Sequence, residues 1–80
     1  MRETVYSLRG GRCRVYVYRY TCRGELYGQD EPVIGHAYHI EGPKLHAGSL
    51  WSSDVSAEQA LGMAQKRFAE YHPKTTLRFA

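Results

Sequence analysis

The chain has 80 residues, which is enough for one small domain, and its 11 basic and 8 acidic residues give a net charge of +3. No stretch approaches the ~20 apolar residues of a membrane helix, and the start of the chain lacks the apolar run of a signal peptide. Two cysteines are too few for a disulfide scaffold and indicate a reducing compartment. We therefore expect residues 1–80 to form a single folded domain with a thin core.

The positive charge is concentrated at the start of the chain. Residues 1–23 contain six arginines and one acid, a net +5, whereas residues 24–80 carry a net −2. Tyrosine is also densest in this first part, with four of the seven tyrosines. A surface for an anionic partner is therefore expected there.

Two strands joined by a tight turn are predicted for the first 22 residues. Residues 4–9 and 12–22 alternate in polarity, and Gly10-Gly11 is typical of a two-residue type I′ turn. This turn pairs Arg9 with Arg12 and Leu8 with Cys13, and paired residues share a face. The predicted core face is Thr4, Tyr6, Leu8, Cys13, Val15 and Val17. The opposite face is Val5, Ser7, Arg9, Arg12, Arg14, Tyr16, Tyr18 and Tyr20.

Further strands are predicted along the rest of the chain. Residues 23–32 are polar and glycine-containing, and we expect a loop whose acids are either solvated or in contact with a basic partner. Residues 33–41 form a third strand, which Gly42-Pro43 ends. Residues 44–51 are predicted as a short fourth strand. Residues 75–80 end the chain as a strand with Leu77 and Phe79 pointing inward.

A helix is predicted between the fourth and last strands. Ser56 and Gln59 have the spacing of a capping box, and Pro73 stops the helix soon after Tyr71. An apolar stripe follows at helical spacing: Ala57, Ala60, Leu61, Ala64, Phe68 and Tyr71. The small alanines allow close approach to a sheet face with Val15, Val17, Gly35 and Ala37. Trp51 is expected to close the core under the helix start, with an interface anchor as the alternative.

These elements predict an α+β fold: an antiparallel sheet of four to five strands with one helix packed on one face, in the order β-β-β-(β)-α-β. One helix covers only one face, so the other is solvated or bound. The candidate partner-binding residues are Arg9, Arg12, Arg14, Tyr16, Tyr18, Tyr20 and Arg23. Arginine pairs with phosphates or carboxylates, and tyrosine stacks on bases or anchors protein interfaces. The alternatives are a dimer contact and ordinary sheet packing, since tyrosine favours strands.

The other reactive residue types do not form a recognisable site. His36 and His39 point to opposite faces of a strand, and Cys13 and Cys22 are too far apart along one strand to bridge. His36 with Glu41 or Tyr38 is an incomplete acid–base pair without a nucleophile. The Arg-Gly-Gly triplet at residues 9–11 is read as a turn rather than an RNA-binding repeat. We expect no metal, no cofactor and no catalysis.

The whole chain is a short α+β chain that is predicted to begin and end in strands and to have one charged face that the helix does not cover. The segments 4–22 and 56–80 carry these features. In size and layout the whole chain resembles the small phage-encoded anti-CRISPR proteins, most closely those of type I-C systems. That family shares no sequence motif, so no residue role is carried over. The resemblance implies an inhibitor that acts in the cytoplasm of the bacterial host. Such an inhibitor binds the type I surveillance complex (Cascade) and prevents the complex from engaging target DNA. The alternatives are a small nucleic-acid-binding module and a homodimeric accessory protein.

Overall fold

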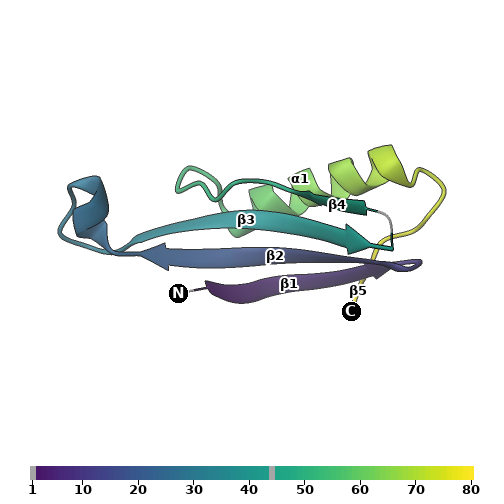
Figure 1. Cartoon of the computed structure of the whole chain (residues 1–80), viewed down its shortest axis with the longest axis horizontal. Coiled ribbons are helices and arrows are strands. Elements are labelled where there is room, and N and C mark those ends of the chain that lie inside the picture. Colours follow the sequence, from purple (N-terminus) through teal and green to yellow (C-terminus); the bar gives the residue numbers. More distant parts are fainter. Residues whose placement is uncertain (1, 44) are drawn as a thin grey trace.

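A computed structural model of the chain describes residues 2–43 and 45–80. Within these residues the chain forms a five-stranded antiparallel sheet with one α-helix on one side (Figure 1). The elements are β1 (Arg2–Gly10), β2 (Cys13–Cys22), the 3-10 helix η1 (Gly24–Tyr27), β3 (Val33–Gly42), β4 (Leu45–Gly48), α1 (Ala57–Tyr71) and β5 (Arg78–Phe79). The spatial order β4-β3-β2-β1-β5 confirms the predicted α+β class. No described helix is long and apolar enough to span a bilayer.

The turn between β1 and β2 lies one residue later than the sequence predicts. Gly10 pairs with Cys13, and Gly11 with Arg12 forms the turn, with φ +59° at Gly11. A Cβ at Gly10 would lie 2.6 Å from a ring carbon of Phe68, so glycine fits at this strand position where a larger residue would collide with the helix. The helix thus uses the missing side chain for close packing. Leu8 consequently pairs with Val15 instead of Cys13, although both still lie on the core face.

An irregularity at Val5 divides β1 into two parts with different pairing. Between Thr4 and Tyr6 the register shifts, so Tyr6 pairs with Val17 whereas Thr4 pairs with Tyr18. An extra residue of this kind exchanges the faces of the residues that precede it. Thr4, predicted for the core face, therefore lies on the opposite face.

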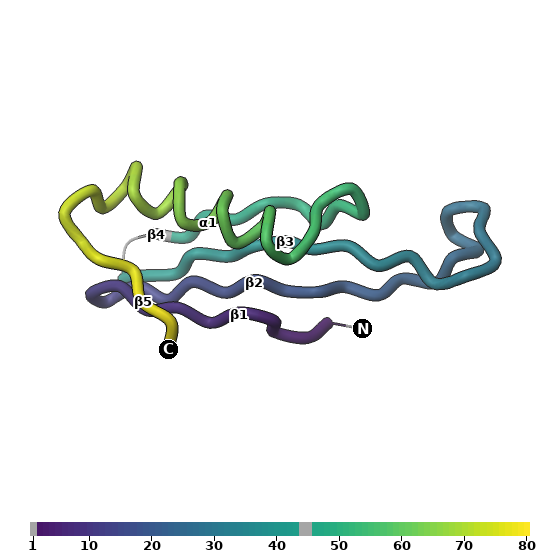
Figure 2. Tube along the Cα trace, turned by 180° about the vertical axis from the view of Figure 1, so that it is seen from behind, coloured from purple at the N-terminus to yellow at the C-terminus, as the bar shows by residue number. Residues whose placement is uncertain are grey.

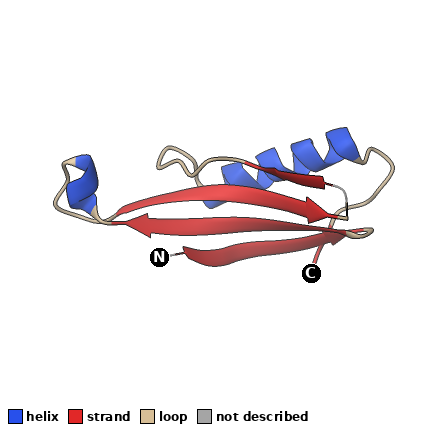
Figure 3. Ribbon diagram, viewed as in Figure 1, coloured by secondary structure: helices blue, strands red, loops and turns tan. Residues whose placement is uncertain are grey.

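The β2–β3 hairpin is the longest part of the sheet and extends past α1 (Figures 1 and 2). Its end was predicted as a loop, but η1 forms there, the short helix at the far left of Figure 3. Gly28 ends η1 with φ +70°, a left-handed conformation that favours glycine. β3 confirms the third predicted strand, and β4 confirms a short fourth strand, although predicted residue Lys44 lies outside the described residues.

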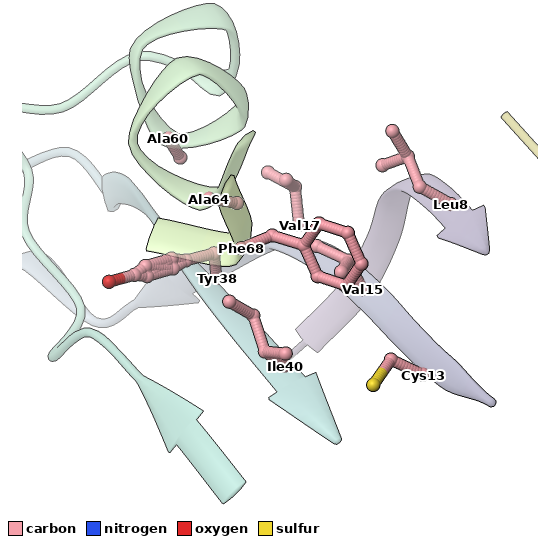
Figure 4. Packing of buried hydrophobic residues seen from close by; sticks show 9 residues of the cluster. All are labelled: Leu8, Cys13, Val15, Val17, Tyr38, Ile40, Ala60, Ala64 and Phe68. Carbon is pink, nitrogen blue, oxygen red and sulfur yellow. The ribbon is translucent and has the colours of Figure 1, made fainter. Parts of the chain in front are cut away.

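Helix α1 has the predicted start and end. The Ser56 hydroxyl accepts a hydrogen bond from the Gln59 backbone N–H (3.1 Å), and the Gln59 side-chain oxygen accepts one from the Ser56 N–H (2.8 Å). The buried helix residues are Ala57, Ala60, Ala64 and Phe68. Figure 4 shows Phe68 pointing toward the sheet, among Val15, Val17 and Ile40. This single layer of side chains between helix and sheet is the core.

One glycine and one alanine of β3 were predicted to face the helix, but both lie on the opposite face of the sheet. Gly35 pairs with Tyr20 and Ala37 with Tyr18, so both share the face of these tyrosines. Tyr38 and Ile40 of β3 contact the helix instead. The β2–β3 register decides which residues of β3 face the helix, and no pattern within β3 alone reveals it.

The placement of Trp51 and of the last strand also differs from expectation. A Cβ on Gly35 would lie 2.5 Å from the Trp51 indole, so Trp51 lies across Gly35 on the face away from the helix. It does not close the core under the helix start. β5 spans only two residues, and Phe79, although opposite Leu8 on the helix side of the sheet, is 63% exposed beside the Tyr6 ring rather than buried. Leu77 does pack against the core, as predicted.

Candidate binding face

The side of the sheet opposite α1 is called here the open face. Its residues follow from the strand pairing, because directly opposed residues share a face. In rows across the sheet it carries Arg2 with Tyr20 and Gly35, Thr4 with Tyr18 and Ala37, Ser7 with Tyr16 and His39, and Arg78 with Arg9, Arg14, Glu41 and His46. The alternating pattern of β2 therefore separates core from open face as predicted.

Three tyrosines at alternate positions of β2 form a column, the tyrosine ladder (Tyr16, Tyr18, Tyr20). The rings of Tyr16 and Tyr18 are stacked with centroids 5.9 Å apart, and Tyr18 meets Tyr20 edge to face at 6.2 Å. All three are half-buried. The Trp51 indole N–H donates to the Tyr20 carbonyl oxygen at 3.3 Å. The ladder is thus a continuous row of aromatic rings, and Trp51 lies beside its Tyr20 end.

Arg2 belongs to this surface, although the sequence reasoning did not include it. Its guanidinium carbon lies 4.7 Å from the centre of the Tyr18 ring, within the range of a cation–π interaction. Burial raises the pKa of the Tyr18 phenol, and the Arg2 charge partly opposes this rise. Arg2 reaches the open face because of the register shift at Val5, which no sequence pattern indicated.

The arginines divide into two groups by position. Arg9 and Arg14 are exposed on the open face, and neither forms an ion pair with a residue that the structure describes. Arg19, which points to the helix side, pairs with Glu3 at 2.6 Å. Arg23, beside η1, pairs with Glu25.

Two predicted site residues lie outside the strands of the open face. Arg12 is in the β1–β2 turn because the turn is displaced by one residue, and it lines a hollow of about 150 Å³ together with Arg9 and Arg14. Arg23 follows the end of β2 and is held by Glu25 at the far tip of the hairpin. Arg9, Arg14 and the tyrosine ladder are together on one face, as the sequence predicts.

The β3–β4 side of the open face adds ionisable groups that the prediction did not include in this surface. The His39 and His46 rings lie 5.9 Å apart, and His39 Nε2 is 3.7 Å from a Glu41 carboxylate oxygen. An open hollow of about 360 Å³ is lined by His39 and Glu41 together with Arg2, Tyr18 and Ala37. The sequence does not predict this grouping, because His46 joins the open face only through its cross-strand pairing with Glu41.

His36, His72 and Cys13 make polar contacts on the helix side of the sheet. His36 lies on the helix side of the sheet, with Nδ1 2.9 Å from the Val55 carbonyl oxygen. It is therefore on the other face of the sheet from Glu41. Cys13 Sγ is 3.5 Å from His72 Nε2, and both cysteines are free thiols. Among residues 2–43 and 45–80, no three His, Cys, Asp or Glu side chains converge as metal ligands would.

Comparison with family models, with curated proteins and with solved structures finds no match to this chain. The fold and the open face therefore provide the basis for a functional proposal.

Proposed function

We propose that the protein is a non-catalytic inhibitor that binds a type I CRISPR surveillance complex through the open face and prevents the complex from engaging target DNA. The observation that supports this is the uneven covering of the sheet. Helix α1 occupies one face, while the other face carries the tyrosine ladder beside Arg9 and Arg14, which lack acidic partners among the described residues. Tyrosine and arginine are among the residue types that most often contribute large binding energies at protein interfaces.

The specific partner follows from the resemblance of the whole chain to small anti-CRISPR proteins in size and layout. A surveillance complex offers anionic surface in its guide RNA and in acidic patches of its subunits. Guanidinium groups bind both phosphates and carboxylates in bidentate fashion. A protein bound at such a surface excludes target DNA by occupying the space that the DNA needs.

The test is co-purification with type I effector complexes, starting with type I-C, followed by a mobility-shift assay of target DNA. We expect the wild-type protein to bind the complex and reduce its DNA binding. Arg14→Glu and Tyr18→Ala should both lose these effects. Arg67→Glu is the matched control, because Arg67 is exposed on α1, away from the open face.

Circular dichroism confirms that each variant is folded, and light scattering measures its mass. The mass matters because a homodimer formed through the open face would also be disrupted by Tyr18→Ala. No binding to any complex in a panel of type I systems would contradict the proposal. So would an Arg14→Glu variant that inhibits as well as the wild-type protein.

A further inference from the structure

Three arginines from neighbouring strands form a row across the open face, here called the arginine row (Arg14, Arg9, Arg78). Arg9 of β1 is directly opposed to Arg14 of β2 on one side and to Arg78 of β5 on the other. Neighbouring strands are about 4.8 Å apart, so the row extends about 10 Å across the sheet. All three residues are exposed.

This arrangement is electrostatically unfavourable for the isolated protein. Like charges directly opposed on neighbouring strands destabilise a sheet. The ion pairs among the described residues use Arg19, Arg23, Arg67 and His39, and none uses a member of the arginine row. Glu41 is opposed to Arg14 but forms no ion pair with it, and the Glu41 carboxylate lies 3.7 Å from His39 Nε2. A bound anion would relieve the repulsion within the row.

Two hollows in the surface adjoin the arginine row. A small hollow of about 90 Å³ has Ser7, Arg14 and Tyr16 in its lining, and a larger one of about 610 Å³ has Arg78 and Phe79. Arg9 lines both hollows. The guanidinium groups are therefore accessible to an anionic ligand without movement of the backbone.

We propose that the arginine row contacts the phosphates of a single-stranded nucleic acid whose bases lie against the tyrosine ladder. The inference rests on the proposed function, because it concerns the same face. It specifies that the component of the surveillance complex bound by this face is a single-stranded nucleic acid. Tyr16, the first ring of the ladder, follows Arg14 by two residues, so charge and aromatic surface adjoin.

A single strand fits this surface better than a duplex does. Proteins that bind single strands combine a cationic track with aromatic rings on which bases stack, and each stacked base contributes about 1–3 kcal/mol. In a duplex the bases are already stacked and paired, so they are not available to rings on a flat sheet. The carboxylates of an acidic protein could also pair with the three arginines. The test below distinguishes an acidic protein from a single-stranded nucleic acid.

The test uses fluorescence anisotropy with fluorescein-labelled 15-nucleotide oligothymidine and oligouridine over a range of NaCl concentrations. Three phosphate contacts predict a slope of log K against log [NaCl] of about −2, at about −0.7 per contact for single strands. Arg78→Gln should weaken binding at least fivefold and reduce the slope by about 0.7. Tyr16→Ala should weaken binding without changing the slope, and Arg67→Gln should change neither.

Absence of binding at low salt, or a slope that Arg78→Gln does not change, would overturn the inference. These results are distinguishable from failure of the proposed function. If the oligonucleotides do not bind but the surveillance complex is still captured through Arg14, the arginine row meets acidic protein and only the inference fails. If the oligonucleotides bind as expected but no surveillance complex is captured, the inference holds and the proposed function fails.

Discussion

Arg9→Gln should make the free protein more stable, which is unusual for a substitution in a sheet. Arg9 is the central member of the arginine row and is opposed by Arg14 and Arg78. Directly opposed pairs change stability by about 0.2–1 kcal/mol each, and exposure places these pairs at the lower end of that range. Removing both repulsions should raise the free energy of unfolding by about 0.5–1 kcal/mol at low salt.

The assay is urea unfolding at about 10 mM and 1 M NaCl, where the Debye lengths are about 30 Å and 3 Å. The gain from Arg9→Gln should be clear at low salt and largely absent at high salt. Arg78→Gln removes one repulsion and should gain less, and Arg14→Gln least, since Arg14 also faces Glu41. An Arg9→Gln protein that is no more stable than wild type at low salt would refute the reasoning.

Three other predictions concern the core, the helix start and the ladder. Phe68→Ala should lower the free energy of unfolding by about 3–5 kcal/mol, measured by urea unfolding, because this ring is 2% exposed in a single-layer core. Ser56→Ala should cost about 1 kcal/mol in the same assay, because it removes the oxygen that accepts from Gln59. The Tyr18 phenol should titrate above its ordinary pKa of 10.0, so its contribution to stability is complete below that pH and is lost as the pH rises through the folded pKa. Absorbance at ~295 nm, wild type minus Tyr18→Phe, measures this pKa, and Arg2→Gln should raise it further.

The features that could be predicted from the sequence depend on neighbours along the chain. Helix α1 begins and ends where predicted because its capping box and apolar stripe are local patterns. The alternation of β2 likewise assigned Val15 and Val17 to the core and the tyrosine ladder to the opposite face.

The features that could not be predicted depend on contacts between distant residues. Gly10-Gly11 is a local turn pattern, whereas Gly10 lies in β1 against the Phe68 ring, which is far along the chain. The turn that follows Gly10 contains Arg12, which therefore lies outside the strands of the open face. Arg78 joins Arg9 only through pairing of the chain ends, which composition and spacing do not reveal.

The division of β2 between two faces has a consequence for how the protein changes over time. Alternate residues of one strand have separate tasks: Val15 and Val17 hold the helix, whereas Tyr16 and Tyr18 contribute nothing to that packing. Substitutions at the outward positions can therefore change the open face with little effect on the core. For the proposed binding function, this means that every second residue of a single strand can vary while the packing of the helix is kept.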